Sequence, residues 1–274
     1  MVSSTVTDRC PPATEASQES VTRVRVRRGA GGRAWVDTRS GLLVPRIVPG
    51  DPPSGDTTCS AHVVLVAAGA LLLAGDDLAL EVEVEAGVRL RLTEVAATVA
   101  YDGRGERASW RARLRVAAGA ELVWDGAPFV VSDGADVDRA LHADVAAGGR
   151  LTLRDTLVLG RYGERGGALR SRTRLSYGGA PVLAEDLDLA ERPAEPDDLG
   201  PSAGARANPG DLPGILRGVR VIDQRVTLGP AVDPVAPPSA AATGALSTPL
   251  LVPGGQGHLT RWLGAQAHES GLNC

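Results

Sequence analysis

The chain has 274 residues, 43% of them hydrophobic and only 3% aromatic, so its core must be built mainly from Val, Leu and Ala. The net charge of −4 argues against a nucleic-acid-binding protein, because such proteins usually carry a basic domain. All the basic residues are Arg, which excludes a Walker nucleotide-binding loop because that loop requires Lys.

The N-terminal region combines a polar tail with a first strand. Residues 1–20 lack a basic region followed by an apolar run, so they predict a disordered tail and no signal peptide. Residues 22–27 alternate between Arg and Thr or Val and predict a strand. Residues 29–34 match a relaxed dinucleotide-binding fingerprint, but strand-like residues follow where a helix is needed. We therefore interpret them as a tight hairpin turn.

The longest apolar run covers residues 63–74. It is shorter than the roughly 20 residues that span a bilayer. We expect two buried strands meeting near Gly69, and no membrane partner.

A repeated sequence pattern occupies the middle of the chain. Val and Leu alternate with polar residues on both sides of four glycines, at positions 87, 119, 148 and 178. The spacings are 32, 29 and 30 residues, which indicates a repeated supersecondary unit.

The register around each glycine predicts how a unit folds. Reflection about Gly87 places Val84 opposite Leu90 and Glu85 opposite Arg89, as cross-strand pairing favours. This predicts either a hairpin with a three-residue turn or a corner where the chain passes between two sheets. The fold class is therefore all-β, with repeated hairpins stacked or sandwiched to bury their shared apolar face.

The C-terminal third is less regular. Residues 191–212 are rich in Pro, Ala, Gly and Asp and predict a linker, whereas residues 218–228 predict another strand. Residues 230–247 are rich in Pro and Ala and predict a flexible segment, and residues 258–264 predict a short amphipathic helix. We expect three parts: a tail (1–20), a β domain (21–229), and a segment (230–274) that adds a strand and a short helix to that domain.

The chain contains few residues arranged for chemistry. It has no nucleophile elbow and no zinc-protease motif, so we expect a protein that is not an enzyme. Its three cysteines are far apart and odd in number, which predicts no disulfide framework and fits a reducing cytoplasm. Cys59 and His62 form the best pair of candidate metal ligands.

Three carboxylates stand among apolar strand residues: Asp76, Asp155 and Glu185. A carboxylate in an apolar setting is costly unless it is paired, hydrated or liganded. Each one either faces solvent or pairs with an Arg such as Arg161, or the three together mark a hydrated internal surface.

Several segments, in order, resemble motifs of the urease accessory protein UreD family, called UreH in some species. They are Leu-Leu-Ala-Gly-Asp-Asp-Leu (72–78), Leu-Thr-Glu-Val-Ala-Ala-Thr (92–98), Glu-Leu-Val-Trp (121–124), Leu-Val-Leu-Gly-Arg-Tyr-Gly-Glu (157–164) and Leu-Arg-Ser-Arg-Thr-Arg-Leu (169–175). The resemblance covers about residues 65–190. Ala74 stands where the family usually has a second Gly, and the Pro-rich tail diverges most.

The resemblance implies a cytoplasmic, non-catalytic, mostly β protein with a helical-sandwich arrangement of strands. Such proteins bind apo-urease and a UreF-like partner that recruits a UreG-like GTPase, which enables GTP-dependent nickel insertion. The resemblance further implies no tightly bound cofactor, transient Ni²⁺ contact, and a water-filled nickel tunnel. Family residues associated with that tunnel correspond to Asp76, Thr98, Asp155 and Glu185.

Two other functions remain open. A β-sandwich module that binds carbohydrate or another small ligand would need exposed aromatic residues, and the chain offers four Trp and three Tyr. A hydrolase would need His62 or His142 beside a carboxylate and a nucleophile.

Overall fold

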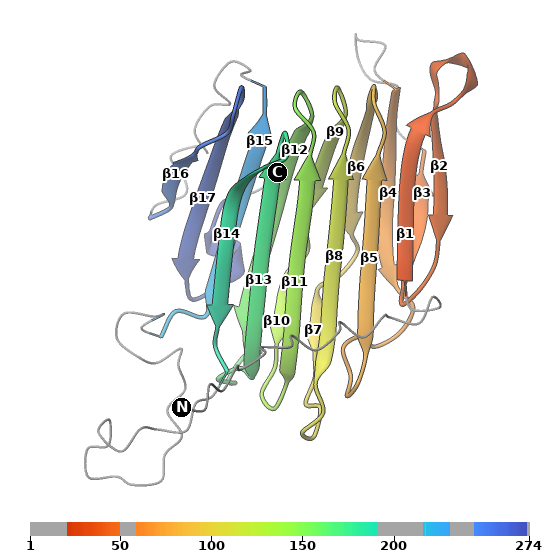
Figure 1. The fold of residues 1–274 in the computed structure, drawn as a ribbon. Coiled ribbons are helices and arrows are strands. Elements are labelled where there is room, and N and C mark those ends of the chain that lie inside the picture. Colours follow the sequence, from red (N-terminus) through yellow and green to blue (C-terminus); the bar gives the residue numbers. More distant parts are fainter. Residues whose placement is uncertain (1–20, 50–58, 191–215, 217, 231–243, 273–274) are drawn as a thin grey trace, which may run out of the picture.

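The computed structural model describes residues 21–49, 59–190, 216, 218–230 and 244–272. These residues form two β-sheets packed face to face (Figure 1), with two single-turn 3₁₀ helices, η2 (Ala30–Gly32) and η5 (Ala267–Glu269). The predicted tail (1–20), the predicted linker (191–212) and most of the predicted flexible segment (231–243) lie outside the described residues.

Sheet A has seven strands, in the order β14 (Ala180–Asp188), β13 (Ala168–Tyr177), β11 (Asp136–Val145), β8 (Ala108–Val116), β5 (Asp77–Val84), β1 (Val21–Arg28) and β2 (Ala34–Arg39). Sheet B runs β16 (Leu246–Leu250), β17 (Gln256–Gly264), β15 (Val221–Gly229), β12 (Arg150–Leu159), β9 (Glu121–Asp125), β6 (Val88–Glu94), β4 (Cys59–Ala67) and β3 (Leu43–Val48). Two short strands, β7 (Thr98–Ala100) and β10 (Phe129–Val131), pair with each other beside β12. The all-β fold class is confirmed.

The repeat is a winding of the chain between the sheets. β5, β8 and β11 lie in sheet A, and each is followed by a strand of sheet B: β6, β9 and β12. Neighbours within a sheet are therefore parallel and one turn of the winding apart, with Val82 beside Leu114. The predicted hairpin pairing is wrong, and the alternative, a corner between two sheets, is right.

The glycines explain the corner. Gly87 and Gly119 have φ values of 72° and 68°, a region that favours glycine. Successive corners stack, since the Gly87 N–H donates to the Gly119 carbonyl at 3.2 Å and the Gly119 N–H donates to the Gly148 carbonyl at 3.1 Å. The corner turns the chain across the sandwich, so the apolar sides of β5 and β6 face each other as parts of different sheets.

Opposite charges pair along sheet A and not across the corner. Arg23 contacts Glu81 at 2.7 Å and Arg25 contacts Glu85 at 2.7 Å, in each case between neighbouring strands. The predicted pairing of Glu85 with Arg89 is therefore wrong: Glu85, just after β5, pairs with Arg25 of sheet A, and Arg89 in sheet B pairs with Glu121.

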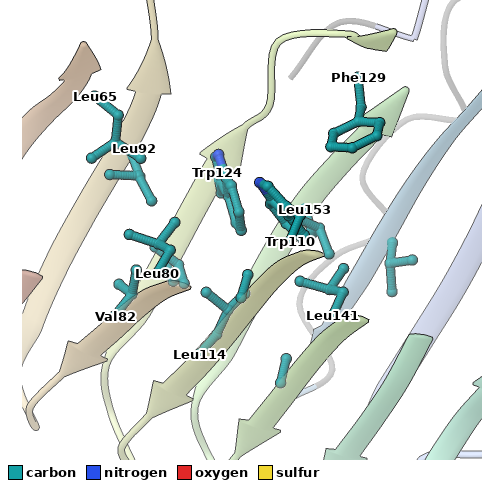
Figure 2. Close-up of a cluster of buried hydrophobic side chains, with 14 of the residues drawn as sticks. Leu65, Leu80, Val82, Leu92, Trp110, Leu114, Trp124, Phe129, Leu141 and Leu153 are labelled. Carbon is teal, nitrogen blue, oxygen red and sulfur yellow. The ribbon is translucent and has the colours of Figure 1, made fainter. Parts of the chain in front are cut away.

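The core fills the space between the sheets (Figure 2). Leu80, Leu114 and Leu141 point inward from sheet A, and Leu92 and Leu153 point inward from sheet B. Three aromatic rings gather at one level: the Trp110 and Trp124 centroids lie 6.4 Å apart, and Phe129 meets Trp110 edge-on at 5.9 Å. Three of the aromatic residues are thus concentrated at one level of the core.

Local predictions have mixed outcomes. The strands at 22–27 and 218–228 and the hairpin turn at 29–34 are confirmed by β1, by β15 and by the β1–β2 hairpin. The pair of strands at 63–74 is wrong: β4 ends at Ala67, and Leu71 and Leu72 are buried from a loop.

The predicted helix at 258–264 is also wrong, because these residues belong to β17. The strand pairs antiparallel with β15 and β16, and its side chains alternate, with Leu259 and Arg261 toward the sandwich interior and Trp262 on the opposite face. The apolar spacing in this segment was too short to distinguish a period of 3.6 from a period of 2.

A second, smaller apolar cluster lies on the outer face of sheet B. Trp262 and Val221 pack there against Leu272, from the segment that follows β17. Among the described residues, no helix is long and apolar enough to cross a lipid bilayer.

Candidate functional site

A row of polar side chains crosses the interior of the sandwich. From sheet B it contains Glu94, Asp155, Gln224 and Arg261, and from sheet A it contains Arg139 and Glu185. We call this set the interior polar row. Asp155, Gln224 and Arg261 are direct cross-strand neighbours on β12, β15 and β17, so the row runs across the strands.

Asp155 and Arg139 form the most deeply buried ion pair. Arg139 Nη2 lies 2.6 Å from Asp155 Oδ1, with both side chains less than 10% exposed. The guanidinium also lies 4.5 Å from the centroid of the Trp110 ring and donates to Ser171 Oγ at 3.3 Å. Stacking and pairing together stabilise a charge that burial alone would make costly.

Hydrogen bonds connect Asp155 to Glu185 without a break. Gln224 Nε2 donates to Asp155 Oδ2 at 3.3 Å, and Gln224 Oε1 accepts from Arg261 Nη2 at 2.7 Å. Arg261 Nη2 lies 2.6 Å from Glu185 Oε1. Two of the carboxylates singled out in the sequence thus belong to one network, each neutralised by an Arg.

Two small cavities flank this network. One, of about 20 Å³, is lined by Glu94, Thr98, Arg139 and Asp155 together with the aromatic rings and is large enough for about one water molecule. The other, of about 160 Å³, is lined by Glu185, Gln224 and Arg261 together with Ser171, Thr173 and Leu side chains. The Nε atoms of Arg139 and Arg261 have no hydrogen-bond partner among the described residues, so each cavity has an unused donor in its wall.

Glu94 was missed by sequence reasoning. Glu94 continues the alternation of Leu90 and Leu92, whose side chains point inward from β6. This alternation in the sequence could have identified Glu94 as an inward-facing residue. Burial raises the pKa of its carboxyl to about 7, against the lowering effect of a 3.1 Å hydrogen bond from Trp124 Nε1 and of the Arg139 charge. The first cavity therefore contains a carboxyl group that titrates near neutral pH.

The structure places the four predicted tunnel residues in three locations. Thr98 is buried on β7 and lines the same cavity as Asp155, and Glu185 lines the other cavity. Asp76 lies apart, in the turn before β5, where its Oδ2 accepts from the Leu73 N–H at 2.9 Å. Thr98, Asp155 and Glu185 therefore share the interior, whereas Asp76 caps a turn.

Cys59 and His62 do not form a shared ligand pair. Both are on β4 three residues apart, so their side chains point to opposite faces. Burial raises the pKa of the Cys59 thiol, and His62 Nε2 lies 2.9 Å from Thr93 Oγ1 with its pKa lowered by burial and then by Arg91. Within the described ranges, no group of three or more His, Cys, Asp or Glu side chains is arranged to hold a metal ion.

A second buried carboxylate, Asp223, also escaped the sequence analysis. It lies on the outer face of sheet B and is fully buried, bound by Arg154 at 2.9 Å, by Thr156 Oγ1 at 2.7 Å and by Ser270 Oγ. Ser270 comes from the segment after β17, so this network attaches that segment to the sheet.

The sequence is similar to those of known proteins. The family model described as UreD urease accessory protein matches residues 20–270. Urease accessory protein UreD 1 of Streptomyces griseus subsp. griseus is 44% identical over 221 residues, covering 80% of this chain and 78% of the relative. Urease accessory protein UreD of Frankia alni is 37% identical over 243 residues, covering 86% and 74%.

Proposed function

The chain belongs to the family of UreD urease accessory proteins, and from this membership we propose that it is a non-catalytic scaffold that binds apo-urease and enables GTP-dependent nickel insertion. Its proposed partners are the apo-urease subunits, a UreF-like accessory protein and, through that protein, a UreG-like GTPase. The proposed setting is the cytoplasm. Nickel is the cargo in this proposal and is not a resident cofactor.

The observation that supports the proposed role in nickel transit is the interior polar row. Nickel that must be passed on needs oxygen or nitrogen ligands that release it readily. Asp155 and Glu185 are already bound by Arg139 and Arg261, so an entering cation must compete with a guanidinium. This competition lowers the affinity of the carboxylates for the cation and favours its release. Spaced charges in cation pores likewise bind an ion weakly enough to let it move on.

The proposal assigns different roles to the predicted transit residues. Thr98 and Asp155 act at the smaller cavity and Glu185 at the larger one. Asp76 lines neither of these two cavities, so any contribution from its carboxylate is made at the protein surface.

The alternative functions have less structural support. Trp110, Trp124 and Trp262 are buried. Trp35 on β2 and Tyr162 in the loop between β12 and β13 are exposed, but four other strands of sheet A separate β2 from β13, so these two rings do not form one aromatic surface for a sugar. Among the described residues, neither His62 nor His142 is hydrogen-bonded to a carboxylate, as a hydrolase would require of its base.

The proposal is tested by co-producing urease, this chain and its partners, and then measuring three quantities. These are recovery of the chain with apo-urease, nickel per urease active site, and urease activity. Glu185→Gln keeps the hydrogen bond to Arg261 but removes the charge, and it should lower nickel loading severalfold with the complex intact. The matched control is Asp186→Asn, the next residue on β14, which pairs with Arg174 outside the row.

Two results would refute different parts of the proposal. Normal nickel loading with Glu185→Gln would exclude Glu185 from the transit route. A wild-type chain that does not co-purify with apo-urease would refute the scaffold itself.

A further inference from the structure

The outer face of sheet A carries an ordered pattern of charge. Arg residues point outward from β1, β8 and β13, and acidic residues point outward from β5, β11 and β14, so positive and negative columns alternate across the sheet. Within the described ranges, no element covers this face (Figure 1). Where an acidic column is complete, an Arg of the next column has a carboxylate directly beside it in register, as Arg115 has in Glu83 and Asp144.

The pattern has a gap in the β11 column. Asp136, Asp138 and Asp144 occupy the outward positions at its ends, but Ala140 and His142 occupy the two positions between them. Ala140 lies in register between Arg111 and Arg172, and His142 lies in register between Arg113 and Arg174. Two carboxylates that the column arrangement calls for are therefore missing at the centre of the sheet.

Two exposed arginines beside the gap have no ion-pair partner among the described residues. On β8 and β13, Arg111 pairs with Asp77 at 2.6 Å, and Arg174 pairs with Asp186 at 2.6 Å. Arg113 and Arg172 are exposed and make no hydrogen bond or ion pair to any residue that the structure describes. The acidic neighbour of Arg113 on β5 is Glu81, whose carboxylate is bound to Arg23.

His142 does not fill the gap with charge. Its pKa is lowered, first by burial and then by Arg113 and Arg174, so the imidazole is neutral at pH 7 while the surrounding guanidinium groups are not. Asp144, also on β11, opposes this effect, and Arg172 adds to it. The gap is thus a local excess of positive charge on an otherwise balanced face.

We propose that this gap is a docking site for an acidic, extended segment of a partner protein, whose carboxylates take the missing places between Arg113 and Arg172. Alternate residues of an extended segment point the same way at about 7 Å intervals, which is also the spacing of the rows on this sheet. Guanidinium groups favour such carboxylates because they form charge-assisted, often bidentate hydrogen bonds. The acidic columns on β5 and β14 would repel a long polyanion such as RNA, so a short acidic stretch fits best.

The inference is independent of the nickel route, because the gap and the interior polar row lie on opposite faces of sheet A. A direct test measures binding of a fluorescent (Glu-Thr)₄ peptide to the full chain by anisotropy at low salt, with (Gln-Thr)₄ and a U-rich RNA octamer as competing probes. The Glu peptide should bind at least about tenfold more tightly than the other two, and Arg113→Gln/Arg172→Gln should weaken it at least about tenfold.

Two further variants make the test specific. His142→Glu supplies a carboxylate next to Arg113 from within the chain and should block the peptide while leaving every Arg in place. Arg25→Gln/Arg27→Gln removes the same charge from the same face at paired positions, and it should change binding less than about threefold. Thermal unfolding of each variant confirms that it is folded.

Three outcomes would overturn the inference. They are equal binding of the Glu and Gln peptides, RNA binding as tight as that of the Glu peptide, and equal losses in the Arg25/Arg27 control and the Arg113/Arg172 variant.

Discussion

Arg139 on β11 reaches across the sandwich to Asp155 on β12, with 2.6 Å between Nη2 and Oδ1, and the ion pair is closed off from solvent by Trp110 and Phe129. Removing one partner leaves the other charge buried and unpaired. Asp155→Ala should therefore lower the free energy of unfolding by about 3–5 kcal/mol, measured by urea denaturation. This instability would confound any use of Asp155→Ala as a probe of nickel transit.

The double variant Arg139→Met/Asp155→Leu separates stability from charge. Apolar replacement of both partners at similar volume is often neutral for stability, so the double variant should recover most of the loss. Additive losses would show that the two side chains are not coupled. A folded double variant is also the proper tool for testing transit without this carboxylate.

Glu94 predicts a pH dependence of stability. Its folded-state pKa of about 7 lies above the usual value of 4.5, so the folded protein binds a proton that the unfolded chain has lost. This contribution to stability is fully present below about pH 4.5 and is lost as the pH rises through 7. Glu94→Gln imitates the protonated form, so it should match the wild type at pH 4 and exceed it at pH 8 by on the order of 3 kcal/mol. A difference that is the same at both pH values would contradict the assignment.

The corner glycines predict modest and position-specific costs. Gly119 has a φ of 68° with open space where a Cβ would stand, so Gly119→Ala should cost only the left-handed backbone penalty of about 1–2 kcal/mol. Gly119→Asn should cost less, because Asn tolerates this conformation. By contrast, a Cβ at Gly167 would overlap the Ala135 carbonyl oxygen, so Gly167→Ala should cost more than about 3 kcal/mol in the same denaturation assay.

The segment after β17 is held by a hydrogen bond from Ser270 to Asp223 and by apolar packing that includes Leu272. Ser270→Ala removes one of the hydrogen bonds to the buried Asp223 and should cost about 1 kcal/mol, and Leu272→Ala empties a fully buried site and should cost about 2–3 kcal/mol. Faster amide exchange limited to β15 and β17 would show that the loss of stability is confined to the strands that this segment covers. Leu251→Ala, at a side chain that is 93% exposed just after β16, is the control and should change little.

The strands and their inward faces could be predicted from the sequence because strand burial has a period of 2. Thr22–Arg27 and the glycine repeat show this directly, and both led to correct elements. The sheet to which each strand belongs could not be predicted. A reflection about Gly87 matches Val84 with Leu90 equally well across a hairpin and across a corner between sheets.

The candidate site could also be predicted only in part from the sequence. Asp155 and Glu185 stood out as acids among apolar residues, but their Arg partners come from β11 and β17, 16 and 76 residues away. Asp76 carried an equally strong sequence signal and lies in a turn. Contacts at such separations depend on which strands become neighbours, and local pattern does not encode that.

The winding also has a consequence for the order of assembly. Each strand of the middle region pairs with one about 30 residues earlier, so each new turn can dock on the preceding one as the chain leaves the ribosome. The interior polar row is completed differently, since Gln224 and Arg261 arrive only with β15 and β17. We therefore expect the interior to stay open to water until the last strands are synthesised, so that the buried charges meet their partners in the final step of folding.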